Sequence, residues 1–486
     1  MDASKGNFVA LSIRCAAAFV QSGIYPASAV CQCARMTQTI SMPAWVFALI
    51  LLFAAVTFAS HFLFPSVRWF FRKRAERVIA KLNSRLTRPI EPFKLARRYD
   101  MIQRLIYDPE VTKAVADYAH EEGIPENVAF EKARHYAREI VPSFSATAYF
   151  TIGMRLARWL TKTLYRVRLG VFNREALEQI DPNATVIFVM NHRSNMDYVL
   201  VTHLVSGAGT LSYAVGEWAR VWPLSSVIKM LGAYFIRRRS RGSLYRRVLA
   251  RYVQMATDGG VTQAIFPEGG LSLTGQVGQP KLGLLSYIVD RPVDGRDVIF
   301  VPVGLNYDQT LEDRFLINAN KAGNRRFRPT AFTVLRSFAV YSWWRLSGEF
   351  RGFGVASVGF GAPLELSTIP PSDDRAEIVA TELMSRIKKI VPVLAAPLVA
   401  RAIAEHGADN RSAIVSTISN MLDDLRSKSM PLPRREVGAM VDDTLNRFAL
   451  RGLIKVSDQH VSVQEGGEDV IAYYAASIAH HFNVSQ

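Results

Sequence analysis

A strongly apolar run extends from Pro43 to Phe64 and contains no Asp, Glu, Lys or Arg. At ~1.5 Å per residue, a helix over this run reaches ~30 Å, the thickness of the hydrocarbon core of a bilayer. A buried helix of a soluble core is the alternative, but such a helix usually keeps one polar stripe, and this run has none. The pattern therefore predicts a transmembrane helix over residues 43–64.

Basic residues flank this run unevenly. Residues 1–42, which we expect to form a poorly ordered leader, contain only Lys5, Arg14 and Arg35 as basic residues. The segment directly after the run has one acid and a series of basic residues, namely Arg68, Arg72, Lys73, Arg74, Arg77, Lys81, Arg85 and Arg88. Because cytoplasmic flanks of membrane spans carry an excess of Lys and Arg, we expect a single-pass protein of the inner (plasma) membrane with its body on the cytoplasmic side.

Helical spacing of apolar residues dominates both ends of this body. Residues 65–165 predict a basic helical region, with Ile102, Leu105 and Ile106 on one helical face. Residues 371–486 predict a mainly helical C-terminal subdomain. Near its end, a helix, a strand-like stretch and a second helix resemble a winged-helix outline. The few charges of that stretch are mixed in sign, so no nucleic-acid partner is expected.

The middle of the body, residues 166–370, has a different period. Short β-branched or apolar runs predict strands over 185–190, 261–267 and 297–307, each followed by a loop and a helical pattern. Strands that alternate with helices predict an α/β domain with a largely parallel sheet flanked by helices. In such sheets, functional side chains gather beyond the carboxyl ends of the strands.

Composition narrows the chemistry of this domain. The 486-residue chain carries 59 Lys and Arg against 42 Asp and Glu, a net charge of +17, which favours anionic partners such as phosphorylated metabolites or an acidic membrane surface. Its three cysteines, Cys15, Cys31 and Cys33, all lie in the leader, so the body has no disulfide or cysteine nucleophile. Serine-hydrolase, zinc-hydrolase and P-loop motifs are absent, and we expect no metal or cofactor.

A histidine and an aspartate follow the strand predicted at 185–190. His192 and Asp197 would point ~140° apart on one helix, so they can meet only if His192 lies in the loop and Asp197 in the first helical turn. The carboxylate would then orient the imidazole, which would act as a general base. The alternative is a capping pair, Ser194 and Asp197, beside an ordinary loop histidine.

Two further segments carry candidate substrate groups. Arg237 and Arg238 end the apolar segment that begins at Gly232, and guanidinium groups can bind a phosphate monoester; a solvated basic helix is the alternative for the arginines that follow. Glu268 and Gly269 end the strand predicted at 261–267, where a carboxylate can hold substrate hydroxyls and a backbone N–H can face an oxyanion. An ordinary glycine-rich turn is the alternative there.

In order and spacing, four segments of the chain resemble the four sequence blocks of the glycerolipid acyltransferase superfamily, and in particular the membrane-bound bacterial glycerol-3-phosphate acyltransferases. They are Asn191–Asp197, Gly232–Arg237, Phe266–Gly270 and Val301–Val303. The resemblance implies a glycerolipid-acyltransferase-like fold. It also implies that His192 is the general base paired with Asp197, that Arg237 binds glycerol phosphate, that Glu268 and Gly269 contact glycerol or the oxyanion, and that Pro302 shapes the acyl side.

The third block departs from the family pattern. Where the family usually has a small residue followed by Arg-Ser-Arg, this chain has Leu271, Ser272 and Leu273, so two phosphate-binding cations are missing. We expect Arg193, Arg238 or Lys281 to substitute for them.

The resemblance implies transfer of a fatty acyl group from acyl-CoA or acyl-carrier protein to the sn-1 hydroxyl of glycerol 3-phosphate, giving lysophosphatidate, beside membrane phospholipid. One alternative is acylation of lysophosphatidate at sn-2, since a lipid acceptor depends less on phosphate contacts. Another is a non-catalytic membrane scaffold that binds acyl-CoA or anionic lipid.

Overall fold

A computed structural model of the protein divides into two units, Met1–Lys81 and Leu82–Gln486. Helix α2 (Ala44–Asn83) begins in the first unit and ends in the second. The structure describes residues 8–9, 42–205, 209–216, 220, 224–237, 242–291, 295–323, 352–406, 410–428, 430–457 and 460–482; side chains of α2 are described except at 60–68, 71–72 and 75. The predicted leader, residues 1–42, therefore lies almost wholly outside the described residues.

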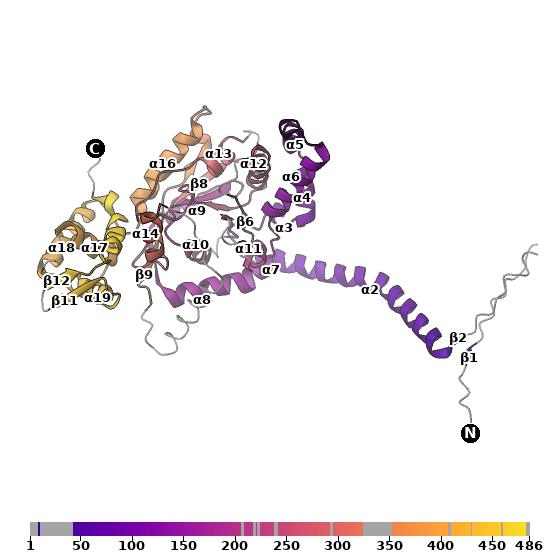
Figure 1. The fold of residues 1–486 in the computed structure, drawn as a ribbon, viewed down its shortest axis with the longest axis horizontal. Helices are drawn as coiled ribbons and strands as arrows, with labels where there is room; N and C mark the ends of the chain where they lie inside the picture. Colours follow the sequence, from indigo (N-terminus) through magenta and orange to yellow (C-terminus); the bar gives the residue numbers. More distant parts are fainter. Residues whose placement is uncertain are drawn as a thin grey trace, which may run out of the picture. The chain divides into compact units, whose positions relative to one another are not determined.

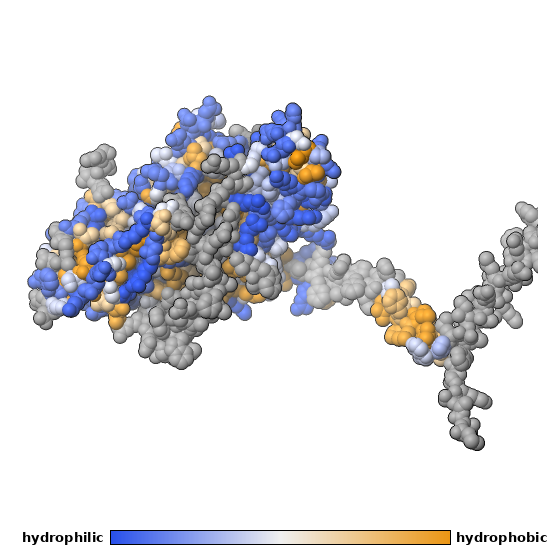
Figure 2. All heavy atoms as spheres, viewed as in Figure 1, coloured by the Kyte–Doolittle hydropathy of each residue, from blue (hydrophilic) through white to orange (hydrophobic). Residues whose placement is uncertain are grey.

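Helix α2 contains the apolar run at its start. Its described side chains there are exposed, for example Phe53 at 75% and Phe58 at 69%, and Figure 2 shows apolar side chains gathered on this part of the helix. Within the part of the chain whose side chains are described, no helix combines the length and the hydropathy of a membrane span. The transmembrane helix predicted over 43–64 is not confirmed, and the side chains at 60–64 lie outside this description.

An eight-stranded mixed sheet forms the centre of the second unit (Figure 1). Its hydrogen-bonded order is β3–β9–β8–β4–β7–β5–β6, with β10 beside β8. Strand β8 pairs antiparallel with β9 and β10, whereas the other pairs are parallel. The strands are β3 (Arg166–Phe172), β4 (Thr185–Met190), β5 (Ser212–Val215), β6 (Tyr234–Phe235), β7 (Gln263–Ile265), β8 (Val298–Tyr307), β9 (Val355–Phe360) and β10 (Leu364–Glu365). The predicted α/β fold with a mostly parallel sheet flanked by helices is confirmed.

The burial of the two central strands, β4 and β8, explains why the sequence predicts them correctly. Every residue of β4 and of β8 is buried, because helices cover both faces of the sheet, and such strands require nearly continuous apolar residues. The strand predicted at 185–190 is β4, the strand predicted at 297–307 contains β8, and the strand predicted at 261–267 contains β7.

Different helices pack on the two faces of the sheet. Side chains alternate along each strand, so Val186 and Phe188 face one core, and Ile187 and Val189 face the other. The first core includes residues of α8 (Met154–Leu164) and α10 (Asp197–Val205). The second includes α12 (Ser243–Asp258), α13 (Gly283–Val289) and α16 (Arg375–Ile390).

The segment between α2 and the sheet is helical and joins the second core. Its helices are α3 (Pro92–Leu95), α4 (Arg98–Ile106), α5 (Pro109–Glu122), α6 (Glu126–Ile140) and α7 (Ala146–Ala148), followed by a π-helical turn at Tyr149–Gly153. Gly123 ends α5 with φ of 64°, a left-handed conformation that favours glycine. Its apolar face, which includes Ile102, Leu105 and Ile106, is buried against the helices of the sheet.

The helices after α16 form a third core together with α14 (Asp313–Lys321). Helix α16 ends at Ile390. Val391 then precedes Pro392, and a residue directly before proline disfavours the helical conformation. The helix, strand-like stretch and helix predicted near the end are present as α19, the antiparallel pair β11–β12 and α20. The elements are α17 (Ala395–His406), α18 (Arg411–Ser427), α19 (Val437–Leu450), β11 (Ile454–Ser457), β12 (His460–Val463) and α20 (Glu468–Ala476).

Candidate active site

His192 and Asp197 meet beyond the carboxyl end of β4. The strand ends at Met190, His192 lies in the following loop, and Asp197 is the first residue of α10. This is the geometry that the five-residue spacing requires. His192 Nδ1 lies 2.9 Å from Asp197 Oδ2, and both residues are buried, at 2% and 0% exposure. With the Nδ1 proton directed at the carboxylate, Nε2 of the neutral ring is left as the proton acceptor.

The Asp197 carboxylate is surrounded by donors. Oδ2 also accepts hydrogen bonds from the backbone N–H groups of Arg193, at 2.7 Å, and Ser194, at 3.0 Å. Oδ1 accepts a hydrogen bond of 2.6 Å from the hydroxyl of Tyr307, the last residue of β8. Burial, followed by the charge of Asp197, raises the pKa of Tyr307 well above its ordinary value, so the phenol remains a donor. The contact between Ser194 and Asp197, which the capping alternative predicts, is therefore present, and the His192–Asp197 pair is present as well.

A second carboxylate holds the loop between these two residues. Glu312 Oε2 accepts a hydrogen bond from the Ser194 hydroxyl at 2.8 Å, and Oε1 accepts from the Asn195 backbone N–H at 3.2 Å and side-chain amide at 3.0 Å. Burial raises the pKa of Glu312, and its hydrogen bonds with Ser194 and Asn195 act in the opposite direction. Sequence reasoning missed Tyr307 and Glu312, which lie more than a hundred residues beyond the loop. The local sequence indicated only that Tyr307 ends a predicted strand and that Glu312 follows this strand.

Glu268 lies beside the loop but is occupied by the backbone. Its Oε1 accepts from the backbone N–H of His192 and its Oε2 from that of Gly278, both at 3.0 Å. Burial raises the pKa of this carboxyl, and these two hydrogen bonds lower it in part. The carboxylate therefore joins the His192 loop to the segment that follows the third block. Its predicted contact with substrate hydroxyls stays a prediction.

Gly269 and Lys281 lie together in the turn after β7. Gly269 has φ of 67°, and its N–H donates to Phe266 O at 3.0 Å, so the predicted oxyanion donor is engaged within the turn. The Lys281 side chain passes close to it, since a Cβ added at Gly269 would lie 3.0 Å from Lys281 Cδ. The structure thus brings these two predicted residues together.

Aromatic rings enclose the imidazole of His192. The ring of Phe266 lies against it with a centroid distance of 4.0 Å and an interplanar angle of 32°. Tyr198 meets it edge-on at 5.6 Å. These apolar neighbours shield the imidazole from water, which strengthens its interaction with the Asp197 carboxylate.

Arg193 is buried at 1% exposure and points toward the C-terminal helices. Its Nη1 donates to Gly275 O, and its guanidinium carbon lies 4.9 Å from the ring centroid of Tyr473. Among the described residues, its Nε and Nη2 have no hydrogen-bond partner. Arg193 thus retains the donor groups that its predicted role in binding phosphate requires.

Arg237 is paired with a carboxylate from α6. Its Nε and Nη2 donate to the two oxygens of Glu139 at 2.9 and 2.6 Å, and Arg220 adds a third bond at 2.7 Å. Burial would raise the pKa of Glu139, but Arg237 and Arg220 lower it below its ordinary value. Sequence reasoning did not anticipate this partner of the predicted phosphate ligand. Arg238 lies outside the described residues.

Pro302 lies in the middle of β8, where it pairs with Val189 of β4. Its ring approaches Gly361, at which an added Cβ would lie 3.0 Å from Pro302 Cγ. Gly361 N donates to Pro302 O at 2.9 Å. Pro302 is therefore a buried residue of the sheet, and its predicted influence on the acyl side stays a prediction.

An apolar cavity of about 240 Å³ borders the loop between His192 and Asp197; these two residues are called the dyad below. Asn195 and Tyr198 contribute to its wall, so it adjoins the imidazole that Tyr198 contacts. The rest of the wall is almost entirely apolar, with residues such as Leu156, Leu160, Val199, Ile228 and Leu231. Within the described part of the chain, no group of three or more His, Cys, Asp or Glu residues is arranged to hold a metal ion.

Comparisons with known proteins point to one family. Residues 171–306 match the family described as Acyltransferase. The glycerol-3-phosphate acyltransferase of Aeromonas hydrophila is 28% identical over 425 residues, which cover 80% of this chain and 50% of that protein. Those of Pseudomonas entomophila and Colwellia psychrerythraea are 28% and 26% identical, over 56% and 78% of this chain and 32% and 46% of theirs. The chain thus spans about half the length, or less, of these relatives.

Among solved structures, the 1-acyl-sn-glycerophosphate (LPA) acyltransferase PlsC from Thermotoga maritima aligns with 57% of this chain and 95% of its own. The two are 19% identical in sequence, with a TM-score of 0.30.

Proposed function

We propose that this chain, which has an acyltransferase-family domain at residues 171–306, transfers a fatty acyl group from acyl-CoA or acyl-carrier protein to the sn-1 hydroxyl of glycerol 3-phosphate, giving lysophosphatidate. The observation that carries the proposal is the buried pair of His192 and Asp197, whose second carboxylate oxygen accepts from Tyr307. Relatives named glycerol-3-phosphate acyltransferase support the choice of acceptor.

The reaction follows from the orientation of the imidazole. His192 Nε2 removes the proton of the acceptor hydroxyl as the hydroxyl oxygen attacks the thioester carbonyl carbon. Asp197, held by its four donors, stabilises the imidazolium that forms. The carbon–sulfur bond then breaks, the new ester forms, and the imidazolium returns its proton to the leaving thiolate. No covalent acyl-enzyme is needed, because the acceptor itself is the nucleophile.

The apolar cavity beside Asn195 and Tyr198 supports an acyl donor with an aliphatic chain. Burial of each methylene group contributes about 0.8 kcal/mol, so a chain placed there would bring binding energy to the loop that carries the dyad. The wall of the cavity and the base share Tyr198, so the thioester end of the chain would lie near His192.

The phosphate of the acceptor needs cations near the dyad. Within the described ranges Nε and Nη2 of Arg193 have no hydrogen-bond partner, Lys281 lies beside Gly269, and Arg237 is held by Glu139. Leu271 and Leu273 replace two arginines of the family pattern, and both pack against the core of the C-terminal helices. Both leucines are partly buried, so arginines there would lose part of their hydration against this apolar core, which favours leucine at these positions.

Leu271 and Leu273 also favour the second candidate, an sn-2 acylation of lysophosphatidate, because a lipid acceptor depends less on cations. Membranes containing the protein should be incubated with a labelled acyl donor and either glycerol 3-phosphate or lysophosphatidate. Product with glycerol 3-phosphate alone supports the proposal, whereas product with lysophosphatidate alone contradicts it. Absence of product with both acceptors, together with saturable binding of acyl-CoA, would identify a non-catalytic scaffold.

We also propose that the reaction takes place at the cytoplasmic face of the inner membrane. The apolar run at 43–64 and the basic residues that follow it support this location. Labelling of residues introduced before and after the run with a membrane-impermeant reagent would test the orientation.

A further inference from the structure

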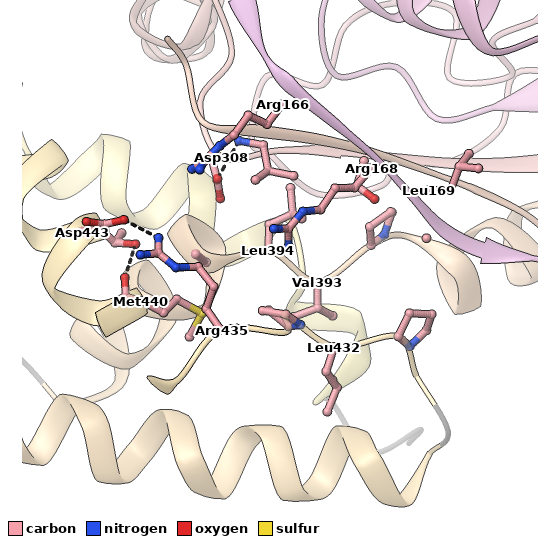
Figure 3. Close-up of a pocket in the computed structure, with 18 of the residues that line it drawn as sticks. Arg166, Arg168, Leu169, Asp308, Val393, Leu394, Leu432, Arg435, Met440 and Asp443 are labelled. Carbon is pink, nitrogen blue, oxygen red and sulfur yellow. Dashed lines mark hydrogen bonds and ion pairs between the residues drawn. The ribbon is translucent and has the colours of Figure 1, made fainter. Parts of the chain in front are cut away.

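A pocket separate from the acyl-transfer site lies between the edge strand β3 and the C-terminal helices (Figure 3). Strands β3 and β9 form one wall. The other walls come from the segment that precedes α17, from the stretch at 431–435 and from α19. None of the catalytic or substrate-binding residues discussed above contributes to its lining.

Four arginines line this pocket against two aspartates. Arg166 and Arg168 come from β3, whereas Arg435 and Arg447 come from the C-terminal side; the acids are Asp308 and Asp443. The arginines belong to segments far apart in sequence, and the fold brings them together. The pocket therefore holds an excess of positive charge that no single segment of the sequence displays.

Both acids already have partners. Asp308 accepts from the backbone N–H groups of Val355, at 2.8 Å, and Ala396, at 3.0 Å. Arg447 lies 3.9 Å from the same carboxylate, and Gly354 leaves space for this approach, since a Cβ there would lie 2.7 Å from Asp308 Cβ. The Asp308 carboxylate thus anchors the walls of the pocket, and the four arginines of the lining still outnumber its two acids.

Asp443 forms an ion pair with Arg435, which lowers the pKa of the carboxyl. Arg166 and Arg168 are exposed and donate no side-chain hydrogen bond to any residue within the described ranges, and the charge of Arg166 acts on both Asp308 and Asp443. Figure 3 shows Arg168 extending from β3 toward Leu394, into the space between the sheet and the helices. Two guanidinium groups on one side of one strand repel each other, and an anion between them would remove that repulsion.

Apart from Ser357 and Thr444, the side chains of the remaining lining are apolar. Leu169, Val393, Leu432 and Met440 line the pocket together with the arginines, and Pro431 and Pro433 make the wall that contains Leu432 rigid. Charged residues often protect an edge strand from pairing with other chains, which would account for the arginines of β3. Protection of an edge does not account for the arginines that converge from the helical side, or for the apolar wall.

We propose that this pocket binds an organic phosphate, with the phosphate between Arg166 and Arg168 and the apolar part of the ligand against Leu432 and Met440. Guanidinium groups suit this ligand because their planar N–H pairs match phosphate oxygens in a two-pronged contact. Such a ligand would contact both the sheet and the C-terminal helices, so its binding would stabilise their packing. A nucleotide and a phospholipid headgroup share this chemistry.

Binding should be measured on the full chain in detergent, by calorimetry and by the shift of the unfolding temperature. The probes are inorganic phosphate, ADP, dihexanoyl phosphatidic acid and dihexanoyl phosphatidylcholine. We expect Arg168→Ala and Arg166→Ala each to weaken binding of the preferred probe by roughly tenfold, as for loss of a charge-assisted hydrogen bond. The matched control is Arg434→Ala, because Arg434 is exposed near the pocket but does not line it.

Binding of ADP in preference to phosphatidic acid would identify a nucleotide site, and the reverse preference a lipid site. Equal affinities for inorganic phosphate, ADP and dihexanoyl phosphatidic acid would overturn the role of the apolar wall. The proposal as a whole fails if the affinities for all anions are the same in wild type and in Arg166→Ala and Arg168→Ala. The His192→Ala variant should bind the probes as wild type does. Binding at this pocket can therefore be tested even if the proposed acyl transfer proves wrong.

Discussion

The Tyr307 hydroxyl donates a 2.6 Å hydrogen bond to Asp197 Oδ1, the carboxylate oxygen that His192 does not contact. Tyr307 ends β8 and Asp197 begins α10, so the bond connects neighbouring elements across the carboxyl edge of the sheet. All four donors to this carboxylate are buried or belong to the backbone. The aspartate therefore has no freedom to rotate away from the imidazole, and the fold itself sets the orientation of the imidazole.

His192→Ala should lower the rate of acyl transfer by roughly 10²- to 10⁴-fold, the usual contribution of a general base. The fold should be retained, because the alanine leaves the backbone bond from residue 192 to Glu268 intact. Steady-state rates and circular dichroism measure the two effects. His460→Ala, at an exposed position of β12, is the matched control. A folded His192→Ala variant with wild-type turnover would refute the assignment of the base.

Tyr307→Phe should lower kcat by roughly tenfold with little change in KM, since a buried charged group loses one hydrogen bond. Without this hydrogen bond the carboxylate is held less firmly against the imidazole, so the base is less well oriented. Tyr165→Phe is the control: its hydroxyl donates to Gln309 O and its ring packs on Tyr307. An equal loss of kcat in both variants would indicate a packing effect alone.

Arg237→Ala should raise the KM for glycerol 3-phosphate by tenfold or more, with kcat nearly unchanged, if the guanidinium binds the phosphate. It also removes two hydrogen bonds to Glu139 and should lower stability. Glu139→Gln separates these effects, because it weakens the ion pair but keeps the guanidinium. Loss of stability in both variants with an unchanged KM would mean that Arg237 is structural.

Folding stability should fall as the pH rises through the titration of Glu312. Burial raises the pKa of this carboxyl from 4.5, so within the window between that value and the raised pKa the folded chain binds more protons than the unfolded chain. Glu312→Gln should remove this component. Urea unfolding at a series of pH values measures the slope for both proteins. If the free energy of unfolding fell more steeply with pH in the variant than in wild type, the pKa of Glu312 would not be raised in the folded chain.

Leu271→Arg should destabilise the protein by about 1–3 kcal/mol without lowering the KM for glycerol 3-phosphate. Although it restores a family arginine, it places the guanidinium against the apolar core of the C-terminal helices. Leu282→Arg, at an exposed position near Lys281, controls for the added charge. Stability follows from thermal unfolding and KM from initial rates. A marked gain in affinity for glycerol 3-phosphate would show that the position faces the acceptor.

Several features were predictable from local sequence. The burial of β4 on both faces demands consecutive apolar residues, and the five-residue spacing of His192 and Asp197 fits a strand-to-helix turn. Arg237 and Glu268 were also placed correctly at the ends of apolar segments. Their partners were not predictable, since Glu139 lies 98 residues before Arg237, and Glu268 is bonded to the backbone of residue 192.

The amino-acid sequence alone determined the α/β pattern, the dyad and the positive charge, because backbone periodicity and short-range geometry depend on neighbours in the chain. Only the tertiary structure decided that Tyr307 bonds to Asp197, that Glu312 holds the loop before it, that Arg237 is paired, and that Arg166 and Arg447 line the same pocket. The order of strands brings such residues together. That order results from the packing of whole faces, and no single segment contains enough information to specify it.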